Sequence, residues 1–275
     1  MPYFTSDGTN LYVDVSGSGA PMLFLHELSL DHRQWLPQRE AFRATNQVFL
    51  LDWRGHGKSA SSPTGHGWGR LAADAHRAAI QAGMSRQQPG VVIAHGYACD
   101  AALQLCLSEP RAMHAAVLVS PVVWGCELGV EWNALVESMR ARASNSDVSG
   151  AVQLLRADTA FSALGREPDL ERGVRAMQER FTGDWLRDEQ EETGTPTATR
   201  LPDCKTPILV VCGADDRDDF RRTAHSIAAA VPRAKVVDLK GVAHLASLED
   251  PEALNTTLRQ FLDDSSGSKR TDSAE

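Results

Sequence analysis

The stretch Val91-Val92-Ile93-Ala94-His95-Gly96-Tyr97-Ala98 decides the fold of this chain. Its first four residues form an apolar run of strand length, typical of a strand buried on both faces of a parallel sheet. A helical pattern begins at Ala98, and Gly96 between the two can adopt the left-handed backbone of a sharp turn at no steric cost. The stretch therefore predicts a strand, a tight turn and a helix.

The same alternation continues on both sides of this stretch. Further buried strands are expected at residues 22–25, 48–51, 116–119, 208–211 and 235–239, after an opening hairpin strand at 11–15. Helices are expected at residues 31–43, 68–82, 98–108, 219–231 and 251–261. Strands that alternate with helices predict a doubly wound, mostly parallel α/β sheet with right-handed crossovers.

The alternation stops in the middle of the chain. Helix-like segments at residues 131–142, 148–155 and 169–181 follow one another there without a strand. We interpret residues 124–205 as a helical cap inserted into one core domain made of residues 1–123 and 206–263. Residues 264–275 carry Ser, Asp and Lys with hardly any apolar side chain, and we expect a disordered tail.

Composition excludes several classes of protein. The 275 residues are 42% hydrophobic and 23% charged, as in globular proteins. The net charge of −8 argues against binding to nucleic acid or to an anionic membrane surface. No apolar run reaches the roughly 18–20 residues of a membrane span. A small-molecule substrate is the partner that remains.

The N-terminus and the cysteines suggest the compartment. The first residues lack the basic and apolar regions of a secretory signal. The cysteines, Cys99, Cys106, Cys126, Cys204 and Cys212, are odd in number and contain no CxxC pair. This pattern suits reduced thiols in a cytoplasmic protein. The sequence leaves a homodimer open.

Polar residues gather where predicted strands end, which is the usual ligand site of an open parallel sheet. The segments are Leu-His-Glu-Leu at 25–28, Asp-Trp-Arg-Gly-His-Gly-Lys-Ser at 52–59, Ala-His-Gly-Tyr-Ala at 94–98, Gly-Ala-Asp-Asp at 213–216 and Gly-Val-Ala-His at 241–244. In this order, and over residues 4–262, they resemble the α/β-hydrolase superfamily.

The resemblance implies two catalytic residues. His244 matches the family's catalytic histidine, and Asp216 matches the acid that orients it, although Asp215 is adjacent. A carboxylate in that position accepts the imidazole N–H and stabilises the imidazolium.

The turn after residues 91–94 departs from the family's Gly-x-Ser-x-Gly, because Gly96 stands where the nucleophilic serine would be. No acyl-serine can form at this residue. Cys99 lies one helical turn further on, where buried packing is the expected role. Ser120 is either a substitute nucleophile or, as we favour, a hydrogen-bonding residue of the wall.

The resemblance to the family also implies an oxyanion hole made by the backbone N–H groups of Leu28 and Tyr97. The departure there is Glu27, where the family has glycine. Glu27 is either a second acid or base or, as we favour, a solvated or Arg-paired side chain. His26, His95 and Trp124 are expected to line the substrate pocket.

Three functions remain open. His244 could activate a water, seated in the space at Gly96, against an ester or lactone. It could instead start a non-hydrolytic reaction, as in the cofactor-free quinolone-cleaving dioxygenases that residues 31–33 and 52–57 resemble. The third is a catalytically silent relative that binds a small ligand. No metal site and no cofactor are expected, because ligand spacing and the GxGxxG fingerprint are missing.

Overall fold

A mixed eight-stranded sheet organises the chain in the computed structural model, which describes residues 2–62, 65–188 and 194–267. The strand order is β1-β2-β4-β3-β5-β6-β7-β8. Strand β2 pairs antiparallel with both β1 and β4, and all other neighbouring strands pair parallel. The strands are β1 Tyr3–Ser6, β2 Thr9–Gly17, β3 Ala20–Leu25, β4 Asn46–Leu51, β5 Gly90–His95, β6 Met113–Val119, β7 Ile208–Gly213 and β8 Ala234–Leu239.

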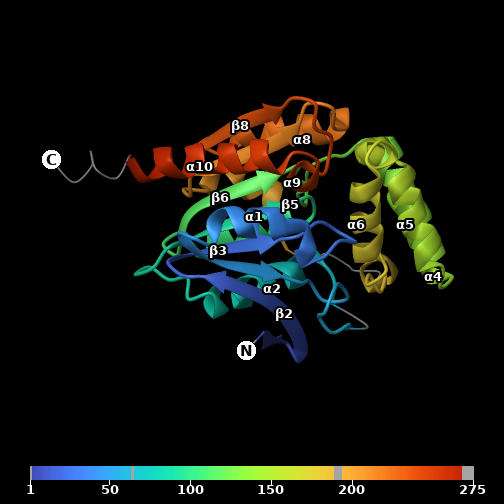
Figure 1. The fold of residues 1–275 in the computed structure, drawn as a ribbon, viewed down its shortest axis with the longest axis horizontal. Helices are drawn as coiled ribbons and strands as arrows, with labels where there is room; N and C mark the ends of the chain where they lie inside the picture. The colour runs from blue at the N-terminus through green and yellow to red at the C-terminus, as the bar shows by residue number, and fades with distance from the viewer. Residues whose placement is uncertain (1, 63–64, 189–193, 268–275) are drawn as a thin grey trace.

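Helices cover both faces of this sheet, so its central strands β3, β5, β6 and β7 are buried on both sides. One face packs against α2 (Trp68–Gln81), α3 (Ala98–Ser108) and α8 (Asp218–Ala230). The other packs against the 3-10 helix His32–Trp35, α1 (Leu36–Phe42), α9 (Ala246–Glu249) and α10 (Pro251–Gly267). Figure 1 shows α1 and α10 in front of the sheet and α2 behind it. The doubly wound α/β prediction is confirmed.

A helical segment separates β6 from β7. It contains α4 (Val130–Ser144), α5 (Val148–Ala157), α6 (Pro168–Gln178) and α7 (Asp184–Arg187), with 3-10 turns at Thr159–Gly165 and Thr197–Asp203. In Figure 1 these helices stand beyond the end of the sheet to which β6 points. Their apolar side chains form a cluster of their own that also includes Leu28, Tyr97 and Leu245 from the strand ends. The segment therefore packs on the carboxyl edge of the sheet.

One expectation at the C-terminus is wrong. Helix α10 continues to Gly267, so residues 264–267 are helical rather than part of a disordered tail, and residues 268–275 lie outside the described residues. Among the described helices, none has the length and apolar character to cross a bilayer.

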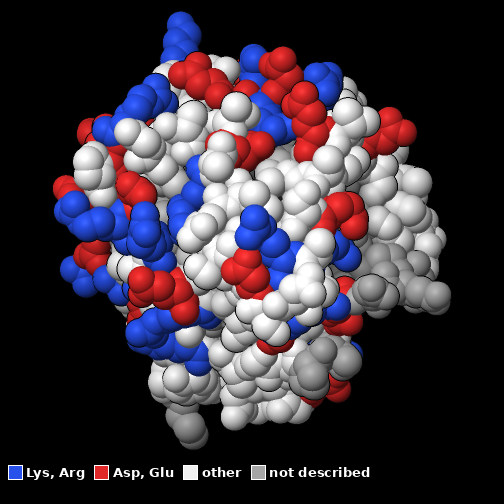
Figure 2. Space-filling view, turned by 90° about the vertical axis from the view of Figure 1, so that its right-hand side faces the viewer, with Lys and Arg blue, Asp and Glu red and all other residues white. Residues whose placement is uncertain are grey.

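The outer face of the helical segment carries charges of both signs. Figure 2 shows Lys and Arg side chains interspersed with Asp and Glu on this face. Pairs such as Arg142–Asp147 and Arg175–Glu171 join neighbours along the chain at 2.7 Å. Such exposed pairs contribute little to stability.

A buried ion pair holds the loop after β4. The Arg54 side chain donates to Asp74 on α2 at 2.7 and 2.8 Å, and these side chains are 2% and 0% exposed. Breaking a buried pair leaves one charge without its partner in the interior.

We predict that Asp74→Ala lowers the free energy of unfolding by about 3–5 kcal/mol. The control Glu171→Ala, which removes the exposed pair with Arg175, should cost less than about 1 kcal/mol. Urea denaturation of both variants checks this. Equal effects of the two substitutions would contradict the structural role of the buried pair.

Candidate active site

Five positions meet at the carboxyl edge of the sheet. Glu27, Gly96, Ser120, Asp216 and His244 each follow the end of a parallel strand, from β3, β5, β6, β7 and β8. The strand order places these five strands side by side. The residues are nevertheless far apart in the sequence, so the site exists only in the folded chain.

Asp216 orients His244. The His244 Nδ1 lies 3.1 Å from Asp216 Oδ2, and both residues are buried. The Ser120 hydroxyl donates to Asp216 Oδ2 at 2.8 Å, and the Arg217 backbone N–H donates to Oδ1 at 2.8 Å. The carboxylate is therefore held on both oxygens, and Ser120 supports the acid.

The Glu27 carboxylate lies against Gly96. A β-carbon built on Gly96 would sit 1.2 Å from Glu27 Oε2, and Gly96 has a φ of +55°. Any side chain at residue 96 would therefore collide with Glu27. The expectation that a water occupies the space at Gly96 is wrong, because a carboxylate fills it.

The two oxygens of Glu27 have different surroundings. Oε1 accepts the backbone N–H of Leu28 at 2.7 Å. Oε2 lies 3.6 Å from His244 Nε2 and accepts no hydrogen bond from the part of the chain that the structure describes. Glu27 is only 5% exposed, and its charged neighbour is His244. The preference for a solvated or Arg-paired Glu27 is therefore wrong.

Hydrogen bonds fix the backbone of the turn that carries Glu27. Its N–H donates to Gln34 Oε1 at 2.9 Å, and its carbonyl accepts from His26 Nδ1 at 2.8 Å. The Nε2 of His26 accepts the Trp53 N–H at 3.1 Å, so Nδ1 carries the proton. His26 thus holds two loops together.

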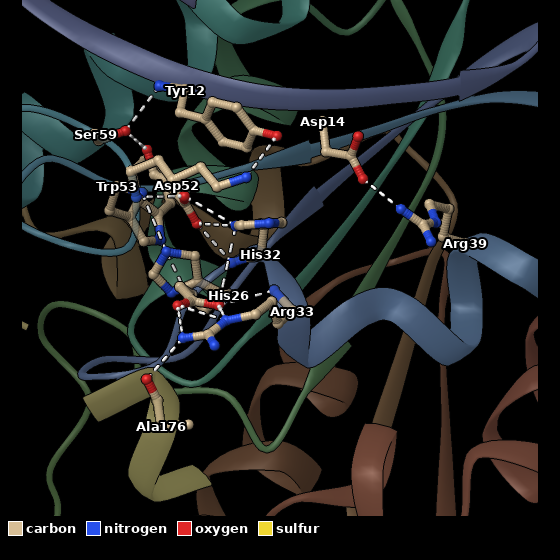
Figure 3. A network of polar contacts seen from close by, with 12 residues as sticks. Tyr12, Asp14, His26, His32, Arg33, Arg39, Asp52, Trp53, Ser59 and Ala176 are labelled. Carbon is tan, nitrogen blue, oxygen red and sulfur yellow. Dashed lines mark hydrogen bonds and ion pairs between the residues drawn. The ribbon is translucent and has the colours of Figure 1, made fainter. Parts of the chain in front are cut away.

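Figure 3 shows the network that extends from this turn. Asp52 accepts from the backbone and ring of His32 at 2.6 and 2.8 Å, and it also accepts the Lys58 N–H. The Arg33 side chain donates to Asp31 at 2.7 Å and to the carbonyl of Ala176 in α6 at 2.7 Å. The turn is therefore tied to both the sheet and the helical segment.

The charges of the site favour an ion pair. Burial would lower the pKa of His244, but the carboxylates of Asp216 and Glu27 outweigh it and raise this pKa to about 10. Burial raises the pKa of Glu27, although His244 and the N–H groups of Leu28 and Tyr97 oppose the shift. The two carboxyl groups therefore favour the imidazolium form of His244, which lies between them.

His95 lies beside this array as a neutral ring. Burial, followed by the charge of His244, lowers its pKa well below the usual value. Its Nδ1 accepts from Gln34 Nε2 at 2.5 Å, so its proton is on Nε2. The Nε2–H of His95 lies near the backbone carbonyl of His244, but the two groups do not form a hydrogen bond of normal geometry.

Among the described residues, two groups bring possible metal ligands together. Glu27, His95 and His244 offer atoms within 4.8 Å of one another, but the protonated Nε2 of His95 has no lone pair to give. The second group is Asp31, His32 and Asp52. Arg33 and the His32 and Lys58 donors already engage its carboxylates. Neither set of residues fits a metal ion as arranged.

A cavity of about 600 Å³ opens beside Tyr97 and Val122. Trp124 also lines it, with Trp68 and Trp185. The N–H of Val122 donates to the Gly96 carbonyl at 3.0 Å, so the cavity reaches residues that touch the turn. Glu27 and His244 themselves are not among its lining residues.

Sequence reasoning missed two supporting residues. Gln34 bridges Glu27, His95 and Ser247, and Glu249 accepts the N–H groups of Ala243 and Leu245 on both sides of His244. The run Leu248-Glu249-Asp250-Pro251 after His244 resembles the family's usual sequence there, which was a usable signal for Glu249. Cys99 is buried and donates to the Ala94 carbonyl at 3.3 Å, while burial raises its pKa.

A family model described as the alpha/beta hydrolase family matches residues 15–257. The chain belongs to this family. It is 25% identical to the provisionally named carbamate hydrolase RutD of Azorhizobium caulinodans, over 95% of this chain and 98% of that protein.

Solved structures share the fold. The thermophilic esterase from Thermogutta terrifontis has a TM-score of 0.81 at 18% identity, covering 96% of this chain and 97% of its own. The enol-lactonase from Burkholderia xenovorans LB400 has a TM-score of 0.77 at 20% identity, covering 95% and 100%.

The contact between Glu27 and Gly96 predicts energetic coupling. Gly96→Ala should lower the free energy of unfolding by about 3 kcal/mol, because the new methyl overlaps the carboxylate and the backbone is left-handed. In a Glu27→Gly background the penalty should fall to about 1 kcal/mol, the cost of the backbone alone. A double-mutant cycle by urea denaturation measures the difference.

The control is Gly173→Ala in α6, where an added methyl meets no atom within 4 Å. It should leave stability unchanged or raise it by up to about 1 kcal/mol. Additive effects of the Gly96 and Glu27 substitutions would contradict the close approach.

The His244 pKa predicts a pH dependence of stability. Its folded value of about 10 exceeds the ordinary 6.5, so the stabilisation is complete below pH 6.5 and is lost as the pH rises through 10. As the pH rises from 6.5 through 10, the free energy of unfolding should therefore fall further in the wild-type protein than in His244→Gln. Urea titrations at several pH values measure both; parallel curves would contradict the raised pKa.

Proposed function

We propose that this protein hydrolyses a small organic electrophile, with Asp216, His244 and Glu27 as its reactive groups and without an acyl-serine intermediate. One observation carries the proposal. His244 lies between the two carboxyl groups, with Nδ1 3.1 Å from Asp216 Oδ2 and Nε2 3.6 Å from Glu27 Oε2. The three side chains lie at the sheet edge where ligands bind in such folds.

Gly96 has no side chain to attack a substrate, and Glu27 supplies the functional group at that place. Asp216 fixes the ring of His244, which then holds or transfers a proton at Nε2. Glu27 lies next to that nitrogen as a proton acceptor or a nucleophile. This differs from a free His244 base, because the two neighbouring carboxyl groups raise the pKa of the imidazole and favour its protonated form.

The relatives support hydrolysis as the reaction class. The names carbamate hydrolase, esterase and enol-lactonase describe attack on carbonyl compounds in those proteins. We propose an ester, a lactone or a related electrophile as the substrate here. The helical segment at residues 124–205 then serves as the cap, with the cavity beside Trp124 and Tyr97 as the entrance.

Two alternatives stay open as predictions. A base-initiated, cofactor-free oxygenation would also use His244 and Asp216, and it would stop when oxygen is removed. A silent binding protein would retain ligand affinity in His244→Ala. A cytoplasmic location and a homodimer also remain predictions.

We predict that His244→Ala lowers kcat/KM for p-nitrophenyl acetate and for a γ-lactone at least about 1000-fold, because the proton carrier is lost. Asp216→Asn should lower it by a comparable factor, since the ring loses its orientation. Initial rates measured under anaerobic conditions check this.

The matched control is His225→Ala, which removes an exposed histidine paired with Asp238. It should keep the wild-type rate. Full activity of His244→Ala would contradict the proposed function.

A further inference from the structure

Aromatic rings form the wall of the cavity beside Tyr97. Trp68 stacks on Tyr97 with the ring centres 5.4 Å apart, and Trp185 meets Tyr97 edge-on at 4.9 Å. The Trp132 Nε1–H donates to the Tyr97 hydroxyl at 3.3 Å, which fixes the phenol ring. Trp124 adds a further ring to the lining. A ligand with a flat apolar body would bury its surface against these rings and contact their faces and edges.

One cation of this cavity lacks an anionic partner. Arg140 from α4 lines the cavity, and its Cζ lies 5.6 Å from the centre of the Trp185 ring. Its Nε is buried and donates no hydrogen bond within the part of the chain that the structure describes, and no carboxylate of that part forms an ion pair with it. Other partly buried arginines, Arg33, Arg39 and Arg217, pair with carboxylates at 2.7, 2.6 and 2.8 Å. The donors of Arg140 are therefore available to a ligand in the cavity.

Tyr97 connects Arg140 to the catalytic turn. Its backbone N–H faces the Glu27 carboxyl group, and its side chain lines the cavity. Burial raises the pKa of the Tyr97 hydroxyl to about 12, and the positive charge of Arg140 is one of the effects that oppose this rise. The guanidinium therefore lies toward the hydroxyl end of a side chain whose backbone follows Gly96. A molecule that lies along Tyr97 has one end near Arg140 and the other near Glu27 and His244.

The charges around the cavity select the kind of anion. The other charged lining residues are Glu127, which is exposed, and Asp188, whose Oδ2 accepts the His66 N–H at 3.1 Å. A dianionic phosphate would meet these two acidic side chains with only one guanidinium to balance its charge. A carboxylate carries a single charge, and its two oxygens match the planar fork of a guanidinium.

We propose that Arg140 binds a carboxylate group of the substrate, and that the substrate is an aromatic or similarly flat carboxylic acid with an ester at its far end. The inference rests on the proposed function, since the ester is the bond that Asp216, His244 and Glu27 hydrolyse. Arg140 determines specificity and takes no part in breaking the bond. A benzene ring would separate acid and ester, as the phenol ring of Tyr97 separates its backbone from its hydroxyl.

A pair of matched esters tests the proposal through turnover. Monomethyl terephthalate carries a carboxylate opposite its methyl ester, and methyl 4-carbamoylbenzoate carries a neutral amide of the same shape. Arg140→Met should lower the ratio of kcat/KM for the acid to kcat/KM for the amide by about 10- to 100-fold, because hydrogen bonds to charged groups contribute about that much to binding. Comparing this ratio between two proteins cancels the intrinsic reactivity of the two esters.

Two further variants separate the guanidinium from the helix that carries it. Arg140→Lys keeps the charge without the planar fork and should recover part of the lost ratio. The matched control is Arg142→Met, because Arg142 lies in the same helix, pairs with Asp147 at 2.7 Å and does not line the cavity. It should keep the wild-type ratio. An equal loss in Arg142→Met would overturn the role of Arg140.

Equilibrium binding tests the same contact without turnover. The probe is 2-naphthoate, which has no ester, and quenching of the tryptophan emission reports its binding. We expect the wild-type protein to bind 2-naphthoate at least about tenfold more tightly than the neutral 2-naphthamide, and Arg140→Met to remove this difference. Added salt should weaken the binding of the acid more than that of the amide, because salt screens the charges.

The outcomes separate this inference from the proposed function. Ester hydrolysis with the same acid-to-amide ratio in wild type and Arg140→Met, and equal binding of 2-naphthoate and 2-naphthamide, overturns the carboxylate site alone. Binding of 2-naphthoate that depends on Arg140, without hydrolysis of any ester or lactone, supports the carboxylate site and overturns the proposed hydrolysis. Absence of both binding and hydrolysis overturns both.

Discussion

The close approach of the Glu27 carboxylate to Gly96 is the contact on which the rest of the site depends. It requires a residue without a β-carbon at position 96 and a left-handed backbone there. It also brings a second carboxyl group to the far side of His244, opposite Asp216. The charge state of the histidine follows from these two neighbours, and with it the chemistry that the site can perform.

The fold supplies the precision that such a contact needs. Parallel strands end at one edge, and each contributes one turn to the site. Gln34, His26 and the Asp52 network fix the turn of Glu27, while Ser120 holds the Asp216 carboxylate and Glu249 holds the backbone on both sides of His244. Because Gln34, His26, Asp52 and Ser120 are buried and hydrogen-bonded, they hold the carboxylate and the imidazole in their relative positions.

The fold was predictable because each strand and helix has its own local pattern. The run at residues 91–94 and the glycine after it specify the turn at Gly96 without help from distant residues. The pairing of Asp216 with His244 followed from a family resemblance that preserves order along the chain. The position of the Glu27 side chain was not predictable, because it depends on its χ angles and on free space beside a residue about seventy positions away. The expectation of a disordered tail from residue 264 was wrong for residues 264–267, because these polar residues extend α10.

Exchange of the two residues tests the account most directly. The variant Glu27→Gly with Gly96→Ser moves the reactive group to the position that the family uses, next to His244. A fluorophosphonate that labels activated serines should then modify residue 96, and adding His244→Ala should abolish the labelling. A folded exchange variant that is never labelled would contradict the claim that Glu27 occupies the nucleophile position of a working His244–Asp216 pair.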